Sequence, residues 1–251
     1  MNHLRDLLER LADNHDVYAP GVATLDAMRD QFDLIATIGE QAVCFWMGEY
    51  ENLKDLAIIP GLCRLPFETC WFECETTVDG KSVYVGALLT SKNGVIVDGS
   101  VWCKFNGMWG LLAAVTSDQF DSERVKIHGE HDEAISGAVL AVGAVRSFLS
   151  ALHCSNVARH LHQPESKIAK ARTKRGKKPL FSYWTLQIGE RSSSSTRGDG
   201  AHASPRVHLR RGHPRQYIQG KWTWVQAHAV GSRSLGMVHK DYGLNGLVCG
   251  I

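Results

Sequence analysis

Three Asx-Gly pairs, each between runs of alternating apolar residues, constrain the fold of this chain most. They are Asp79-Gly80, Asn93-Gly94 and Asn106-Gly107. An Asx-Gly pair between apolar runs is the strongest short-range signal for a β-hairpin, because both residues tolerate the positive φ angles of a two-residue turn. The sequence therefore predicts four antiparallel strands in order, at residues 69–77, 82–89, 95–105 and 108–115.

A meander of this kind has an apolar face that needs cover, and an apolar helix is predicted soon after it. From Glu133 to Leu152 the apolar residues recur at helical spacing, and residues 3–13 form a second amphipathic pattern. The predicted fold class is α+β, with an antiparallel β-meander covered by helices and followed by a C-terminal part that contains a basic β-hairpin.

The charge is divided unevenly along the chain. Residues 1–155 contain 11 Lys/Arg and 22 Asp/Glu, a net charge of −11, whereas residues 156–251 contain 17 and 4, a net charge of +13. We therefore divide the chain into an acidic α+β domain (1–155) and a basic part (156–251) with a Ser/Gly-rich loop at 189–204. A basic part indicates a phosphate backbone as partner, because each Lys or Arg contact releases counterions. The alternative is that the two parts complement each other within one fold.

Two basic segments supply the candidate nucleic-acid contacts. Residues 164–178 are typical of a short basic helix ended by Gly176, and residues 206–228 of a hairpin with a basic first arm and a Gln219-Gly220 turn. Their cations would hold phosphates, and two tryptophans on one strand face would either stack on unpaired bases or cover a core. The candidate nucleic-acid-binding residues are Lys170, Arg172, Lys174, Arg175, Arg210, Arg211, Arg215, Lys221, Trp222 and Trp224.

His213, which follows Gly212 between basic residues, is the candidate catalytic residue. A histidine there would act as general acid or base on a ribose 2′-hydroxyl, because its pKa lies near physiological pH. Nearby arginines would stabilise the charge that develops on phosphorus. This hypothesis makes the chain a metal-independent ribonuclease. The alternative is a structural histidine or one that only contacts phosphate.

The basic part resembles two groups of known proteins. Gly212-His213, Gly220-Lys221, Trp224-Val225 and His228 are similar to the core hairpin of HicA-type mRNA interferases. That resemblance implies a small fold like a double-stranded-RNA-binding domain, with one catalytic histidine after a glycine-containing turn.

A broader resemblance is carried by Asn156-Val157 and residues 170–183 and 204–225. These segments look like a family of uncharacterised bacteriophage and mobile-element proteins, and the Arg-Gly-His piece is distantly similar to a type V-A anti-CRISPR protein that lowers its effector's mRNA. The resemblance implies a phage accessory or counter-defence role that acts on RNA.

No metal site and no cofactor is predicted. The seven cysteines form no CxxC pair and are interpreted as free thiols of a reducing cytosol, and no Walker or Rossmann glycine motif occurs. His160 and His162 would share a strand face, but no nearby acid or thiol completes a metal site.

We expect the chain to act in the host-cell cytoplasm without contact with a membrane. Its N-terminus lacks the pattern of a signal peptide, and no apolar run reaches the length of about 18 residues that spans a membrane. The acidic domain would engage a host or defence protein. The alternative function is a protein-interaction module that inhibits a host defence or transcription component without binding nucleic acid.

Overall fold

A computed structural model describes most of the chain. The described residues are 3–13, 17–18, 32–33, 35–53, 58–59, 61–92, 95–116, 126–129, 131–188, 206–210, 212–225, 228–230 and 232–237. The predicted Ser/Gly-rich loop at 189–204 lies outside them.

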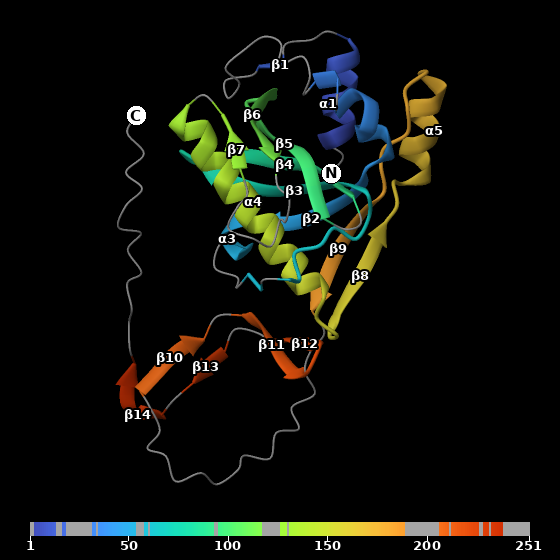
Figure 1. Cartoon of the computed structure of the whole chain (residues 1–251). Helices are drawn as coiled ribbons and strands as arrows, with labels where there is room; N and C mark the ends of the chain where they lie inside the picture. The colour runs from blue at the N-terminus through green and yellow to red at the C-terminus, as the bar shows by residue number, and fades with distance from the viewer. Residues whose placement is uncertain are drawn as a thin grey trace.

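The predicted meander forms the centre of the molecule (Figure 1). Its strands pair antiparallel in sequence order, and two of its turns have the positive φ angles that the Asx-Gly pairs predicted: 51° and 72° at Asp79-Gly80, and 50° and 81° at Asn106-Gly107. The predicted α+β fold class is therefore confirmed. The four strands are β3 (Thr69–Val78), β4 (Lys81–Lys92), β5 (Val95–Phe105) and β6 (Met108–Thr116).

The meander belongs to a larger mixed sheet, which has nine strands among the described residues, in the order β1-β6-β5-β4-β3-β2-β9-β8 with β7 also paired to β6. Strand β2 runs parallel to both β3 and β9, and β1 runs parallel to β6. Two strands of the basic part thus extend the sheet of the acidic part. The added strands are β1 (Val17–Tyr18), β2 (Val43–Glu49), β7 (Lys126–His128), β8 (Val157–His162) and β9 (Tyr183–Ile188).

Helices cover both faces of this sheet. The predicted apolar helix is α4 (Asp132–Leu152), which packs Ala138, Val145 and Leu149 into the larger apolar core on one face (Figure 1). On the other face α1 (His3–Ala12) packs its leucines over three buried tryptophans. The core therefore has two layers, one on each side of the sheet. Two short helical segments, η1 (Gly39–Gln41) and α3 (Tyr50–Leu53), flank β2.

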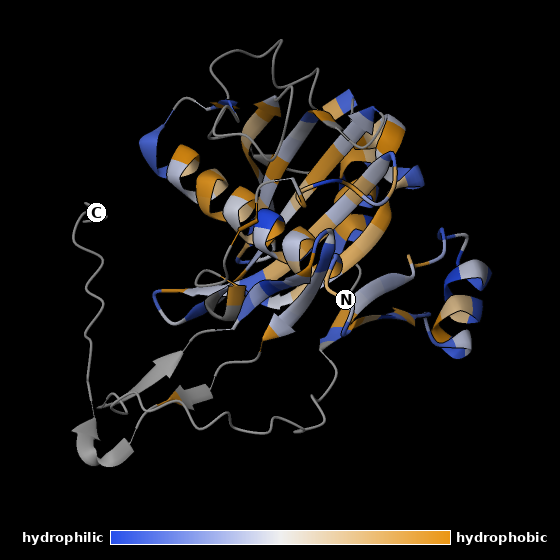
Figure 2. Ribbon diagram, turned by 60° about the horizontal axis from the view of Figure 1, so that its bottom comes forward, coloured by the Kyte–Doolittle hydropathy of each residue, from blue (hydrophilic) through white to orange (hydrophobic). Residues whose placement is uncertain are grey.

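Helix α4 is the one helix among the described residues that is long and apolar enough to cross a membrane. Of its most apolar stretch of 18 residues, 56% is buried inside the fold. Apolar residues, which Figure 2 colours orange, recur along α4, and those on one side of the helix pack on the sheet.

The C-terminal part contains the predicted basic helix, α5 (Ser166–Lys174), and the predicted hairpin, in which β11 (His213–Ile218) pairs with β12 (Lys221–Val225). The predicted first arm of the hairpin was too long. Its residues 206–210 form β10 (Arg206–Arg210), which pairs instead with β13 (His228–Val230) and β14 (Ser232–Met237). The arm is divided near Gly212, which packs against the Trp224 ring as described below.

Candidate nucleic-acid interface

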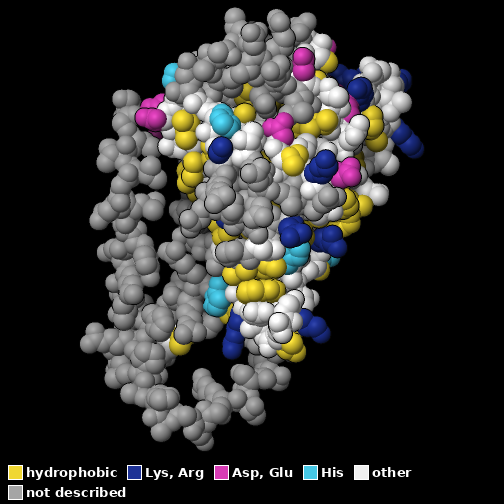
Figure 3. Space-filling model, in the orientation of Figure 1, with side chains coloured by type: hydrophobic (Ala, Val, Ile, Leu, Met, Phe, Trp, Pro, Cys, Tyr) yellow, Lys and Arg dark blue, Asp and Glu magenta, His cyan; other side chains and the backbone are white. Residues whose placement is uncertain are grey.

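Helix α5 has no apolar side turned toward a core, and none of its residues is buried. Two residues beyond its end lies Gly176, whose φ of 68° is easily adopted only by glycine. A helix that buries none of its residues is either solvated or reserved for a partner, because burial does not stabilise it. Figure 3 shows basic side chains along the edge where Figure 1 places α5.

Four basic side chains on α5 and at its C-cap are exposed to solvent: Lys167, Lys170, Lys174 and Arg175. None of them forms an ion pair with an acidic residue of the described ranges, although α5 lies beside α1 (Figure 1). Their charge is therefore available to an external anion as far as the described residues are concerned. Lys170, Lys174 and Arg175 belong to the predicted nucleic-acid contacts, and Lys167 does not.

Arg172 differs from its neighbours on α5. Its guanidinium pairs with Glu9 of α1, and its Nε donates to the Lys178 carbonyl oxygen at 2.9 Å. Lys178 pairs with Glu40 at 2.8 Å, and Lys177 lies 4.0 Å from Glu9. The alternative that acidic and basic parts complement each other thus describes these three cations, but not the four that pair with no described acidic residue.

Strand β8 is the outermost strand of the large sheet on the side of α5. Arg159, His160 and His162 on it are all exposed, because β8 has only β9 as a neighbour in the described sheet. His160 and His162 do share one strand face, as their spacing indicated. The sequence signal for an interface here was weak, because an alternating polar strand is also typical of any solvated sheet edge.

The β11–β12 hairpin exposes Arg215 and Lys221, two of the predicted contacts, but its two tryptophans differ from each other in exposure. Trp224 is only 4% exposed and packs against Ala151 and Cys154 in a small apolar cluster. The alternative that it covers a core is therefore the one that the structure supports. Trp222 is half-buried at the edge of the same cluster.

Backbone and side-chain hydrogen bonds attach this hairpin to the end of α4 and the start of β8. The Asn156 side chain accepts from the Trp224 backbone N–H at 2.6 Å and donates to the Trp224 carbonyl oxygen at 2.9 Å. The Ser155 backbone N–H donates to the Trp222 carbonyl oxygen at 2.8 Å. The hairpin is thereby held beside β8.

We expect Asn156→Ala to loosen the hairpin while the large sheet stays folded. The substitution removes both partners of the Trp224 backbone, and an unsatisfied buried polar group costs about 1–3 kcal/mol. Amide hydrogen exchange should accelerate in β11 and β12 but not in β4 or β5. Ser155→Ala is the control, because its backbone bond to Trp222 does not need the side chain. Unchanged exchange in β12 of the Asn156 variant would contradict this account of the anchor.

The predicted catalytic residue, His213, is half-buried at the start of β11, opposite Val225. A Cβ added to the preceding Gly212 would lie 3.1 Å from the Trp224 ring, so the glycine allows that ring to pack closely. Arg210 is the last residue of β10, and Arg211 lies outside the described residues. A catalytic role of His213 stays a prediction.

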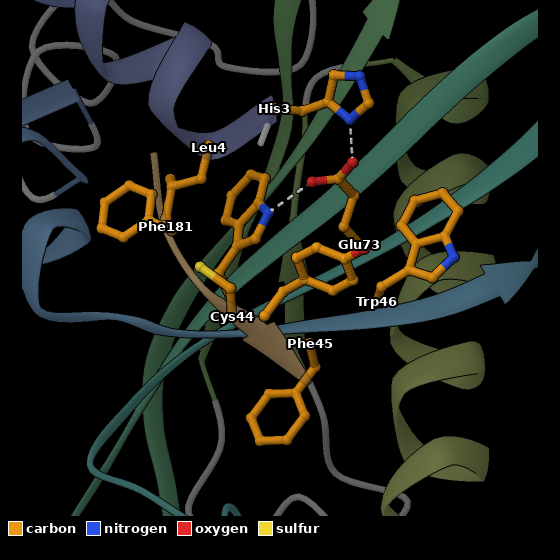
Figure 4. A pocket seen from close by; sticks show the side chains of 9 residues that line it. His3, Leu4, Cys44, Phe45, Trp46, Glu73 and Phe181 are labelled. Carbon is orange, nitrogen blue, oxygen red and sulfur yellow. Dashed lines mark hydrogen bonds and ion pairs between the residues drawn. The ribbon is translucent and has the colours of Figure 1, made fainter. Parts of the chain in front are cut away.

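A small aromatic pocket on the α1 face of the sheet holds a buried carboxylate that sequence reasoning missed (Figure 4). Glu73 is 5% exposed; it accepts a hydrogen bond from Trp71 Nε1 at 3.0 Å and pairs with His3. The His3 ring lies against Tyr84 in a tilted arrangement, with centroids 3.9 Å apart and an interplanar angle of 31°. These contacts fix the first turn of α1 on the sheet, which explains why the carboxylate is buried there.

The cysteine thiols near this pocket are buried. Burial raises the pKa of Cys44, beside this pocket, to about 12, and it raises the pKa of Cys70 and Cys74 to the same value. Such thiols stay protonated and are poor nucleophiles. Six cysteines are free thiols within the described part of the chain, and that part contains no group of three metal-ligating side chains.

Comparison of the chain with protein-family models, with curated proteins and with solved structures found no match. The candidate interface is therefore interpreted from its own geometry and charge.

Proposed function

We propose that this protein binds nucleic acid, with RNA preferred, along one edge of its large sheet. The main support is the set of exposed cations on α5, which no described acidic residue neutralises although α1 and its carboxylates lie close by. Four unpaired positive charges close together in a solvated segment repel one another. A phosphate backbone relieves that repulsion, and its binding releases counterions.

The proposed interface, which we call the basic edge, has three consecutive pieces. The hairpin is attached where β8 begins, β8 spans the middle, and α5 follows its end after residues 163–165 (Figure 1). Six residues of strand extend over about 20 Å, which is enough for several nucleotides. The exposed basic residues along this edge are Arg159, Lys167, Lys170, Lys174, Arg175, Arg215 and Lys221.

The biological role that we propose rests on the resemblance to phage proteins described above. In that role the chain is a phage accessory or counter-defence protein of the host cytoplasm, and binding of RNA promotes loss of a target mRNA. The acidic α+β part, net −11, would then engage a host or defence protein. Ribonuclease action of the chain itself, through His213, is a narrower form of the same proposal.

One observation favours the alternative of a protein-interaction module. Val139 and Leu140 of α4 are 50% and 43% exposed, and adjacent exposed apolar residues on a helix suit a protein partner. The two functions differ in their response to salt. Binding to nucleic acid of generic sequence weakens steeply as salt rises, whereas a specific apolar protein interface depends on salt only weakly.

The proposed function is tested by equilibrium binding of the full chain to labelled single- and double-stranded RNA and DNA at several salt concentrations. We expect binding to every generic ligand at low salt, tightest for RNA, with a steep loss of affinity as salt rises. Absence of binding at low salt would contradict the proposal and favour the protein-interaction alternative.

A further inference from the structure

We infer that the basic edge is a site for single-stranded nucleic acid, in which an unpaired base stacks on the His162 ring. The inference rests on the proposed function and makes it narrower, because it names the form of nucleic acid and the contact that selects it. It is carried by the geometry of His162, Tyr183 and Thr185 on β8 and β9.

His162 and Tyr183 form a ring pair across the last two strands of the sheet. They are direct cross-strand partners, their rings are almost parallel at 8°, and their centroids lie 4.8 Å apart. The His162 Nε2 is hydrogen-bonded to the Thr185 hydroxyl at 2.8 Å. Tyr183 itself is half-buried and packs against the core on the α1 face. The histidine ring is thus held in a fixed orientation before any ligand arrives.

The outer face of the His162 ring points beyond the sheet. Tyr183 covers the inner face, and β8 is the terminal strand on this side of the described sheet. His162 is therefore exposed to solvent. Its imidazole ring is an aromatic surface of the kind on which bases stack. A base placed there would continue the stack outward.

The surroundings of His162 suit a chain of nucleotides. His160 lies two residues earlier on the same strand face and is also exposed, at a spacing of about 6.6 Å along an extended strand. Helix α5 begins four residues after His162 and presents Lys167 and Lys170. Bases on the strand face and phosphates on the helix would be held at the same time.

A duplex does not fit this site as well as a single strand. Its bases are already paired and stacked inside the helix, so the His162 ring has no free base to stack on unless a pair opens. The cations of α5 would still attract the phosphates of a duplex. The inference therefore predicts that His162 contributes to binding of single strands but not of duplexes.

The test compares wild-type protein with His162→Ala and His162→Phe by fluorescence anisotropy on a labelled single-stranded RNA and on the matched duplex. Base stacking on a side chain is worth about 1–3 kcal/mol by alanine substitution, and the lower half of that range corresponds to about tenfold in affinity. We expect His162→Ala to lose about tenfold on the single strand and less than twofold on the duplex. The phenylalanine variant keeps the ring and should stay within about threefold of wild type.

His128→Ala is the matched control. His128 is also an exposed histidine on a short edge strand, hydrogen-bonded to a threonine, with its Nε2 at 2.9 Å from the Thr116 hydroxyl. This control variant should bind both RNAs like wild type. A single strand that carries 2-aminopurine adds a direct readout, because stacking quenches its fluorescence; the quenching should vanish in His162→Ala alone.

The failures of the two proposals are distinguishable. If wild-type protein binds no nucleic acid, the proposed function is wrong and this inference falls with it. If wild type binds but His162→Ala matches it on the single strand, only the inference is wrong. Equal losses on single strand and duplex, or a phenylalanine variant as weak as the alanine variant, would also overturn the stacking role.

Discussion

Gly86→Ala is expected to destabilise the protein by about 3 kcal/mol or more, because a Cβ at this position overlaps a buried ring. The added Cβ would lie 2.1 Å from Trp71 Cζ2. Trp71 is fully buried, packs edge-on against Trp109 and donates its indole N–H to Glu73, so its ring has no space into which to move. The core on the α1 face therefore requires a residue without a side chain at position 86.

Urea denaturation followed by tryptophan fluorescence measures this effect. Gly143→Ala is the control, because Gly143 lies in α4 and a Cβ there meets no atom within 4 Å. Glycine to alanine inside a helix gains up to about 1 kcal/mol, so the two substitutions should change stability in opposite directions. A Gly86→Ala protein as stable as wild type would show that Trp71 does not occupy the described position.

Glu40→Gln is expected to cost about 2 kcal/mol at neutral pH, since it leaves a buried guanidinium without its counter-charge. Arg5 is only 4% exposed; it binds the Glu40 carboxylate through two bonds of 2.6 and 2.8 Å, and its Nε donates to the Pro179 carbonyl oxygen. We place the cost below that of a fully buried pair because the Glu40 side chain is about one-third exposed.

The same pair gives a pH dependence with a definite sign. The hydrogen bond from Arg5 lowers the pKa of Glu40 from 4.5 to about 2; burial opposes this shift, and Lys178 adds to it. Because the folded-state pKa is the lower one, the stabilisation is fully present above pH 4.5 and is lost as the pH falls toward 2. Thermal unfolding from pH 7 to pH 2 should show this loss in wild type and a smaller loss in Glu40→Gln.

Glu68→Gln serves as the control for both measurements. Glu68 is exposed, and its side chain forms no ion pair or hydrogen bond with another described residue, so we expect a change within about 0.5 kcal/mol. If Glu40→Gln proves as mild as Glu68→Gln, the Arg5–Glu40 pair does not hold α1 against η1.

The parts of the fold that local chemistry determines were predictable from the sequence. The three Asx-Gly pairs predicted the order of β3 to β6, because each pair lies between two strands that are neighbours in the chain. The Asn93-Gly94 pair itself lies outside the described residues. The spacing of apolar residues in α4 and Gly176 after α5 are local signals of the same kind. Gln219-Gly220 likewise predicted the hairpin, although its first arm proved shorter than expected.

The parts that depend on distant partners were not predictable. Cys44 pairs with Tyr183 across β2 and β9, and no residue near either position indicates the other. Whether a cation is exposed also depends on remote contacts: Arg172 meets Glu9 of α1, whereas Lys170 on the same helix does not. The His162–Tyr183 ring pair exists only because β8 and β9 pair in one particular register.

The most direct test of the central proposal is the salt dependence of single-stranded RNA binding, compared between wild type and a variant that neutralises α5. In Lys170→Gln/Lys174→Gln/Arg175→Gln three exposed charges are removed without loss of buried contacts. The control, Lys81→Gln/Lys92→Gln/Lys126→Gln, removes three exposed lysines from the acidic part.

For single strands the slope of log affinity against log salt is about −0.7 for each phosphate contact. If the three α5 residues each contact a phosphate, their variant should bind more weakly at low salt and with a slope shallower by about 2, while the control keeps at least most of the wild-type slope. Equal slopes in wild type and the α5 variant would contradict the proposal that the basic edge holds nucleic acid.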